Sequence, residues 1–241
     1  MKKICTICNL SFALQNGTSL IKNVSFDVNF KDFIIILGAN GSGKTSILKI
    51  LNGTNKDYLG NIKIIHNQEL KKLSYKKIAR YVTAITQNTS DSLFIDLSLR
   101  QNLQLYMESS DDKIHAVDDF LSLLNSINSK LTQLLDVKIS TLSGGEKQCF
   151  LLALNLFFKH KLLLLDEHTS ALDPKTAQDI MKITALQIQK QDITCIMTTH
   201  NLDDAINYGN RLIIMKDGEV LKIFEQTEKD LLSKVDLFKF Y

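Results

Sequence analysis

The chain has 241 residues, of which 44% are hydrophobic and 23% are charged, and its formal net charge is +3. This length and composition fit one enzyme-sized globular unit and exclude disordered and fibrous proteins. Because the lysines are spread along the sequence, the mild positive charge does not predict a nucleic-acid-binding stripe, and no nucleic-acid partner is expected.

The sequence predicts neither a membrane span nor a signal peptide. Its longest apolar run, residues 149–158, is about half the length of a bilayer span and contains Asn155. The cysteines include one Cys-x-x-Cys pair, Cys5 and Cys8, but no second pair with zinc-site spacing. We therefore expect a chain with reduced cysteines that stays in the cytoplasm.

The predicted strands are of two kinds. Hydrophobic and polar residues alternate over 24–30, as in a half-buried strand, and residues 2–9 are its expected antiparallel partner. Continuously apolar runs indicate strands buried on both faces of a parallel sheet. These runs are 33–37 (FIIIL), 162–165 (LLLL) and 193–197 (ITCIM). The sequence thus predicts an α/β fold in which an N-terminal antiparallel β layer accompanies a parallel core sheet.

Helical patterns replace strand patterns between residues 88 and 141, notably over 99–107 and 116–125. We expect a helical lobe at about 88–141, inserted into a single domain, 1–241, whose catalytic core is 1–87 and 142–241. Near the end, two β-rich runs, 211–215 and 219–224, flank Lys216, Asp217 and Gly218, which is a hairpin signal.

Residues 38–45 read GANGSGKT and fit the pattern G-x-x-x-x-G-K-[ST] between the FIIIL strand and a helical run. Such glycines let backbone N–H groups approach phosphate oxygens, and the helix N-terminus adds its dipole. Lys44 would reach the β and γ phosphates of a nucleotide, and Thr45 would offer its hydroxyl to Mg²⁺. The predicted nucleotide-binding residues of this P-loop are Gly38, Asn40, Gly41, Ser42, Gly43, Lys44, Thr45 and Ser46.

Two carboxylates, Asp166 and Glu167, follow the LLLL strand, at the end where parallel sheets place their ligands. We expect Asp166 to hold the magnesium ion through water, and Glu167 to act as a general base on the attacking water. Successive side chains of an extended strand point to opposite sides. His168 should therefore face away from Glu167 and serve in packing or hydrogen bonding at the following turn.

A second phosphate-binding cap is predicted at residues 142–148 (LSGGEKQ). Ser143, Gly144 and Gly145 stand at the start of a helical segment that runs to about Phe158, so backbone N–H groups and one hydroxyl are available there. Two separate phosphate-binding motifs in one chain indicate that each serves a different ATP in a dimer.

Together these motifs resemble those of the nucleotide-binding subunit of an ABC transporter, over essentially the whole chain. Gln87 in AITQN resembles the Q-loop, residues 170–173 (SALD) the D-loop, and His200 in IMTTHN the switch histidine, all in the family's order. The resemblance implies the ABC type of P-loop NTPase fold and an ATPase with ATP and Mg²⁺ as cofactors. It also implies a head-to-tail dimer that sandwiches each ATP between one P-loop and the other LSGGE.

The resemblance also assigns roles. Gln87 would sense Mg²⁺ and the attacking water and face the permease, His200 would contact the γ-phosphate, and Phe12 would lie under adenine unless it is a core residue. The implied catalytic residues are Glu167, His200, Gln87 and Lys44, and the implied metal-binding residues are Thr45, Gln87 and Asp166. Beside Gln87, residues 88–97 (NTSDSLFIDL) form a polar loop that contains the apolar residues Leu93 and Phe94. We expect these two side chains to be exposed and the loop to dock a coupling helix of the permease.

Three positions depart from the family pattern. Glu146 stands where glutamine is more usual, and Ala39 and His168 each replace a frequent proline. None of these changes removes a group with an expected chemical role.

Several segments resemble an importer subgroup described as tryptophan/tyrosine or related amino-acid systems, among them 11–18 (SFALQNGT), 92–103 (SLFIDLSLRQNL) and 162–177 (LLLLDEHTSALDPKTA). This resemblance favours an importer ATPase, peripheral on the inner face of the cell membrane, with transmembrane permease subunits and an extracytoplasmic substrate-binding protein as partners. Two alternatives stay open. One is the ATPase of an efflux or lipoprotein-release permease, and the other is a soluble ABC ATPase of the iron–sulfur assembly type.

Overall fold

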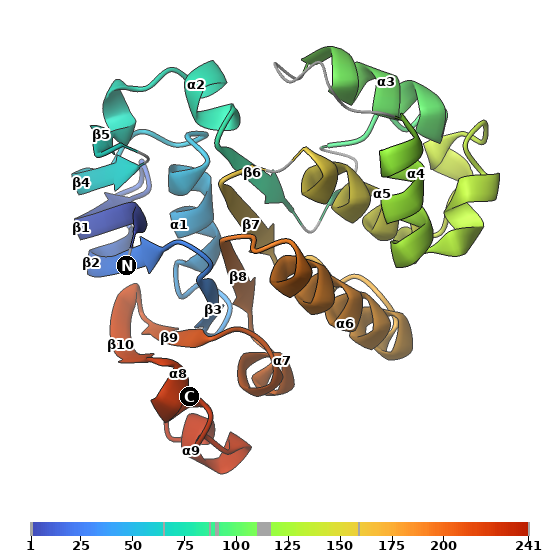
Figure 1. Ribbon diagram of the computed structural model, residues 1–241. Helices are drawn as coiled ribbons and strands as arrows, with labels where there is room; N and C mark the ends of the chain where they lie inside the picture. The colour runs from blue at the N-terminus through green and yellow to red at the C-terminus, as the bar shows by residue number, and fades with distance from the viewer. Residues whose placement is uncertain are drawn as a thin grey trace. The chain divides into compact units, whose positions relative to one another are not determined.

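The computed structural model describes residues 2–64, 66–86, 88–89, 92–109, 117–158 and 160–240. The chain divides into two compact units. The first comprises Met1–Ala84, His160–Glu167 and Ile188–Tyr241, and the second comprises Ile85–Lys159 and His168–Gln187. The first unit holds both β-sheets, and the second is helical (Figure 1).

An antiparallel sheet opens the first unit, with the strand order β2-β1-β4-β5. Its strands are β1 (Lys3–Ala13), β2 (Ser19–Asn29), β4 (Leu59–Ile64) and β5 (Gln68–Glu69). The predicted antiparallel pairing of the first two strands is confirmed, for example with Cys5 opposite Val28. Successive side chains of a strand point to opposite faces, so the apolar residues of β1 and β2 gather on one face of the sheet. On this face, Ile7, Leu10 and Ile21 are almost fully buried.

A second, mixed sheet forms the core, with the strand order β10-β9-β3-β8-β7-β6. Its strands are β3 (Phe33–Leu37), β6 (Val82–Ile85), β7 (Leu162–Asp166), β8 (Cys195–Thr199), β9 (Arg211–Lys216) and β10 (Glu219–Phe224). β3 runs parallel to both of its neighbours, β8 and β9, and β7 runs parallel to β8. The expected parallel core and the terminal β9–β10 hairpin are therefore confirmed. β8 begins two residues later than predicted, because the N–H of Ile193 still bonds the end of the preceding helix at Ile188.

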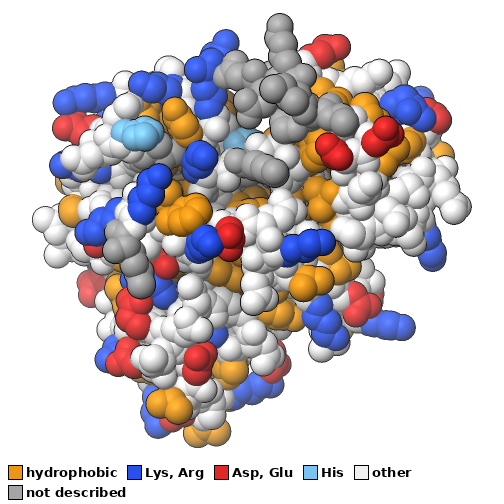
Figure 2. Space-filling view, viewed as in Figure 1, with side chains coloured by type: hydrophobic (Ala, Val, Ile, Leu, Met, Phe, Trp, Pro, Cys, Tyr) orange, Lys and Arg blue, Asp and Glu red, His pale blue; other side chains and the backbone are white. Residues whose placement is uncertain are grey.

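Helix α1 (Lys44–Leu51) lies between the two sheets of the first unit (Figure 1). Its Ile47, Ile50 and Leu51 are fully buried in the core that both sheets share. The other helices of this unit are α2 (Tyr75–Ala79), α7 (Leu202–Asn207), α8 (Gln226–Lys229), α9 (Lys234–Phe238) and the 3₁₀ turn η1 (Leu70–Lys72). On the face drawn in Figure 2, Lys and Arg side chains gather around α2 and β5, whereas both signs of charge mix around α8 and α9.

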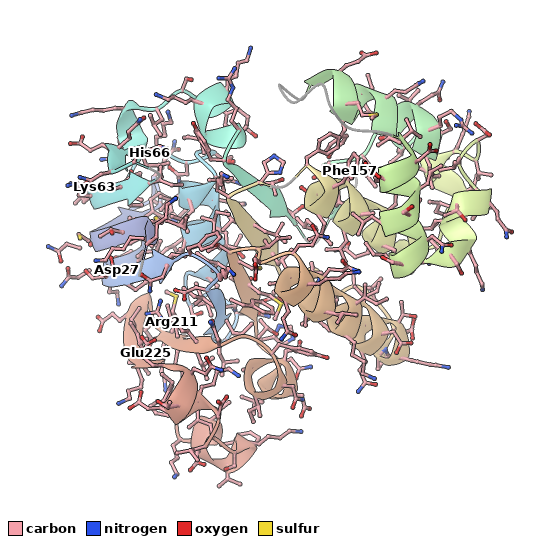
Figure 3. The ribbon with its side chains drawn as sticks, viewed as in Figure 1. Asp27, Lys63, His66, Phe157, Arg211 and Glu225 are labelled. Atoms are coloured by element: carbon pink, nitrogen blue, oxygen red, sulfur yellow. The ribbon has the colours of Figure 1, made fainter. Side chains whose placement is uncertain are left out.

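A buried ion pair anchors the start of the core sheet. Arg211, at the first position of β9, donates to Asp32 (2.8 Å) and to the carbonyl oxygen of Asp27 (2.7 Å), and it also pairs with Glu225 (2.9 Å; Figure 3). Burial of the guanidinium is compensated because several acceptors surround it. The amino ends of β3 and β9 are thereby held in register, so that their carboxyl ends finish together at the opposite edge.

The second unit contains α3 (Leu99–Ser109), α4 (Val117–Ile127), α5 (Gly144–Phe157), residues 174–187 of α6 (Pro174–Lys190) and the 3₁₀ turns η3 (Ser129–Gln133) and η4 (Ile139–Thr141). Phe120 of α4 meets Phe150 and Phe157 of α5 edge to face, with ring centroids 6.0 and 5.3 Å apart. Because α4 packs on α5, this unit extends beyond the predicted lobe of 88–141. Among the described residues, no helix is both long and apolar enough to cross a membrane.

Candidate functional site

The carboxyl ends of β3, β7 and β8 meet at one edge of the core sheet in the first unit. Parallel pairing sets Leu37 of β3 opposite Thr199 of β8, and Asp166 of β7 opposite Thr198 of β8. Neighbouring parallel strands end on the same side, which is where such sheets bind ligands. The loop after β3, the carboxylates after β7 and the histidine after β8 therefore converge.

The P-loop folds tightly onto the start of α1. Gly41 and Gly43 have positive φ angles of 82° and 96°, which residues with a side chain rarely adopt. A Cβ atom on Gly43 would also lie 2.5 Å from the carbonyl oxygen of Leu20, so the position requires glycine. Gly43 caps α1 without a side-chain hydrogen bond. The first N–H groups of a helix have no partner within the helix, so this end suits an anion.

Buried polar groups of the P-loop also fit a phosphate ligand. The Ser42 hydroxyl is buried, and no hydrogen-bond partner for it exists among the described residues. Such a group is costly unless something satisfies it, and a phosphate oxygen would do so. Lys44 is only 4% exposed. Its Nζ donates to the carbonyl oxygens of Gly38 (2.8 Å) and Ala39 (3.1 Å) and lies 3.3 Å from Oε1 of Glu167.

Thr45 and Asp166 form a pair of oxygen ligands. The Thr45 hydroxyl donates to Oδ1 of Asp166 over 3.0 Å. A hydroxyl beside a carboxylate fits Mg²⁺, which takes few protein ligands and completes its shell with water and substrate phosphates. Within the described parts of the chain, no group of three or more His, Cys, Asp and Glu side chains could hold a metal ion by itself. A magnesium site here would depend on the nucleotide.

Glu167 is held between a lysine and a histidine. Its Oε1 faces Lys44, and its Oε2 lies 3.0 Å from Nδ1 of His200. The backbone of Glu167 is left-handed, with φ at 44°, and its N–H donates to the carbonyl oxygen of Thr198 over 3.3 Å. A non-glycine residue in this region carries strain, which commonly marks functional sites. This carboxylate is 17% exposed, so water can reach it.

His168, in the second unit, has different surroundings. It is 3% exposed, and its Nε2 lies 3.3 Å from the Thr184 hydroxyl of α6. Burial lowers the pKa of His168 to about 4, so the imidazole is neutral at neutral pH. His168 is thus buried beside a hydroxyl, which agrees with the predicted role in packing or hydrogen bonding.

The LSGGE segment, also in the second unit, forms the cap of α5. Ser143 is the N-cap and makes a capping box with Glu146. Oε2 of Glu146 accepts from the Ser143 hydroxyl (2.8 Å) and from the Ser143 N–H (2.9 Å), and these bonds lower the pKa of Glu146. Gly144 and Gly145 form the first turn of the helix. The predicted helix start is thus confirmed, and the Ser143 hydroxyl bonds a carboxylate. Phosphate binding at this cap stays a prediction.

A family model described as "ABC transporter" matches residues 21–170 of the chain. This match covers more than half of the sequence. The chain belongs to the ABC transporter family. The tyrosine transport ATP-binding protein of Clostridioides difficile (strain R20291) is 32% identical in an alignment 245 residues long, gaps included. This alignment covers 97% of this chain and 96% of that relative. The energy-coupling factor transporter ATP-binding protein EcfA of Malacoplasma penetrans (strain HF-2) is 32% identical over 227 residues, which cover 94% of this chain and 78% of that relative.

Solved structures of ABC proteins share the fold. The structure of cbiO1 from Clostridium perfringens, described as part of the ABC transporter complex cbiONQ, superposes with a TM-score of 0.79 at 25% identity, covering 98% of this chain and 96% of that one. A dimeric structure of the ATP-binding cassette MJ0796 bound to ADP and Pi gives 0.76 at 23% identity, covering 92% and 99%. The predicted ABC ATPase fold is confirmed. The protein is the ATP-binding subunit of an ABC transporter, an ATPase whose hydrolysis is coupled to transport.

Other predicted site residues of this ABC subunit are less constrained by the structure. Gln87 lies outside the described residues. Phe12 is half-buried in β1 and packs against the core, which fits both interpretations of it. In the P-loop, Asn40 is exposed and Ser46 is half-buried. Cys5 and Cys8, the Cys-x-x-Cys pair, are free cysteines.

The expectation for Leu93 was wrong. Leu93 is 5% exposed, whereas the neighbouring Phe94 and Ile95 are 58% and 41% exposed. The side chain of Asn102 in α3 bonds both the N–H and the carbonyl oxygen of Phe94, which fixes this loop against the helix. The loop therefore presents Phe94 and Ile95, and Leu93 belongs to the core of its unit.

Sequence reasoning also missed Thr198, whose hydroxyl bonds Asp166 over 2.7 Å. The signal that could have found it is its place two residues before His200. A hydroxyl directly after a predicted core strand lies at the end where parallel sheets bind their ligands.

Proposed function

We propose that this ABC subunit hydrolyses ATP to drive the import of an amino acid or a similar small solute through separate permease subunits. The meeting of Lys44, Thr45, Asp166, Glu167 and His200 at one sheet edge carries the hydrolytic part of the proposal. The relative named for tyrosine transport, which matches this chain nearly end to end, supports the choice of solute. The choice of import rests on the resemblance of several segments of the sequence to an importer subgroup.

In the proposed reaction, Lys44 leaves the carbonyl oxygens of its own loop for the β and γ phosphates of ATP. Glu167 orients the attacking water and accepts its proton, and His200 holds the far oxygen of that carboxylate while contacting the γ-phosphate. Thr45, Asp166 and Gln87 would hold Mg²⁺, which would neutralise charge on the phosphates.

The proposal includes a head-to-tail dimer. Each chain carries a P-loop in one unit and the α5 cap in the other. Two phosphate-binding motifs per chain suit two ATPs shared between two copies. In each composite site, Ser143, Gly144 and Gly145 of one copy would bind the γ-phosphate held by the P-loop of the other.

The permease contact is proposed at the exposed residues Phe94 and Ile95. Exposed apolar side chains in an otherwise polar loop mark interaction sites, and this loop follows the Q-loop position, Gln87, closely in sequence. Docking here would hold the subunit on the inner face of the membrane.

A second candidate is a transporter of the energy-coupling factor kind. The EcfA relative, which covers 94% of this chain at the same identity, favours it. The two candidates differ in their partners. Our first proposal includes an extracytoplasmic substrate-binding protein, whereas a transporter of the energy-coupling factor kind would work without one.

The deciding experiment is purification of the chain from its native membrane, followed by ATP-driven uptake of labelled tyrosine and other amino acids in vesicles that hold the purified complex. We expect a permease and a binding protein to co-purify and an amino acid to be taken up. A complex that drives uptake of none of the amino acids tested would contradict the proposed import.

The catalytic part is tested by Glu167→Gln, which should bind ATP but turn over about 10³-fold more slowly. Glu219→Gln, at an exposed carboxylate of β10, is the matched control and should behave as wild type.

A further inference from the structure

Thr198 lies at the centre of the site without having any expected chemical role. It is 1% exposed, and the strand register sets it directly opposite Asp166 of β7. β8 thus presents a hydroxyl to Asp166, and His200, the residue directly after β8, lies against Glu167.

The Thr198 hydroxyl has a single proton, and the geometry indicates where it goes. The oxygen lies 2.7 Å from Oδ1 of Asp166 and 3.4 Å from the carbonyl oxygen of Leu165. The shorter bond has a charged acceptor and is therefore the stronger one. Thr45 donates to the same Oδ1 over 3.0 Å. Two hydroxyls from two different elements thus fix the rotation of the Asp166 carboxylate.

The same hydroxyl also accepts a hydrogen bond from the next residue. The N–H of Glu167 lies 3.3 Å from Oγ1 of Thr198 and 3.3 Å from its carbonyl oxygen. This N–H belongs to the residue with the left-handed φ of 44°. A strained conformation persists only when its surroundings hold it in place. Thr198 therefore contacts both the side chain of Asp166 and the backbone of Glu167.

We propose that Thr198 is a positioning residue that sets Asp166 and Glu167 relative to each other. Its hydroxyl keeps one oxygen of Asp166 directed at Thr45 and holds the turn that aims Glu167 between Lys44 and His200. This inference rests on the proposed function of Thr45 and Asp166 as magnesium ligands. Mutation of groups that orient metal-binding carboxylates commonly costs about 10- to 100-fold in metal affinity or activity.

The test compares Thr198→Val, which keeps the shape and removes the hydroxyl, with Thr198→Ser, which keeps the hydroxyl. Thr194→Val is the matched control, because Thr194 is also 1% exposed and its hydroxyl accepts one hydrogen bond, from the N–H of Lys31 over 3.0 Å. Binding of a fluorescent ATP analogue is titrated with Mg²⁺, and binding without metal and the ATPase kcat are measured on the same samples.

We expect Thr198→Val to raise the half-saturating Mg²⁺ concentration about tenfold and to lower kcat, while binding without metal stays at the wild-type level. Thr198→Ser should restore both values to within about twofold, and Thr194→Val should change neither. If the valine variant does not fold, Thr198→Ala takes its place in the same titration.

Wild-type values in the valine variant would overturn the positioning role, as would equal changes in Thr198→Val and Thr194→Val. Failure of the wild-type chain to bind or hydrolyse ATP with Mg²⁺ would instead contradict the proposed function. The two failures are therefore distinguishable in one set of measurements.

Discussion

Helices α1 and α5 both begin at a glycine-containing motif, yet their first turns are built in opposite ways. α1 begins after Gly43, a left-handed residue without a side chain, and no acidic residue stands in its first turn. α5 begins after Ser143, an extended residue whose hydroxyl and N–H both bond Glu146 in the first turn.

The difference concerns what each helix end offers to a phosphate. The α1 end combines a helix N-terminus, a buried ammonium and a buried hydroxyl, so it can bind an anion without help. The α5 end carries a negative charge of its own, so a phosphate must share or displace the Ser143 hydroxyl. We infer that most of the affinity for nucleotide resides in the P-loop, and that the α5 cap adds a weaker contact.

The largest effect is expected from Lys44→Ala. It removes the charge-assisted hydrogen bonds that Lys44 would make with the β and γ phosphates, each worth about 1.5 kcal/mol. The loss of two such bonds should weaken ATP binding by roughly 100-fold. Lys147→Ala, which removes a lysine near the start of α5, is the matched control and should change binding less than about threefold. Binding of a fluorescent ATP analogue to the single chain measures both. Similar losses in the two variants would remove the contrast between the helix ends.

A smaller effect is expected from adding a methyl group at each helix start. Gly43→Ala should lower the free energy of unfolding by about 2 kcal/mol, because φ is 96° and the new Cβ would lie 2.5 Å from the carbonyl oxygen of Leu20. Gly144→Ala should change it by less than about 0.5 kcal/mol, since its nearest neighbour is a flexible leucine methyl group at 3.4 Å. Urea unfolding of both variants is the measurement, and equal destabilisation would contradict the prediction.

The smallest effect is expected from Glu146→Gln. Glutamine can still complete the capping box but brings no charge near the phosphate, so ATP-driven dimerisation should strengthen a few-fold. Sedimentation of the dimer in the Glu167→Gln background measures this. Weaker dimerisation would show that the carboxylate helps the contact.

The same substitution has a pH signature. The pKa of Glu146 is lowered in the folded chain, so the contribution of its charge to stability is present above about pH 4.5 and is lost as the pH falls through the folded pKa. Wild type and Glu146→Gln should therefore converge in stability at acid pH and differ, by less than about 1 kcal/mol, at neutral pH. Unfolding curves from pH 3 to 7 check this, and the Glu219→Gln control should follow wild type more closely.

Sequence patterns predicted those parts of the molecule that depend on consecutive residues. FIIIL is β3 to the residue, and the P-loop lies between that strand and α1 as the motif requires. The errors came from contacts between segments that are not adjacent in sequence. Leu93 was expected to be exposed, but Asn102 fixes its loop against α3. Thr198 went unnoticed because its importance depends on the register between β7 and β8, which no local pattern states.

The left-handed backbone at Glu167 has a consequence for laboratory evolution. Glycine or asparagine would adopt a φ of 44° at lower cost than glutamate, so either would relax the chain at the very residue proposed to activate water. A screen that rewards heat resistance alone would therefore enrich variants that have lost the reaction at this position. Selection of this subunit for robustness needs turnover as a second criterion.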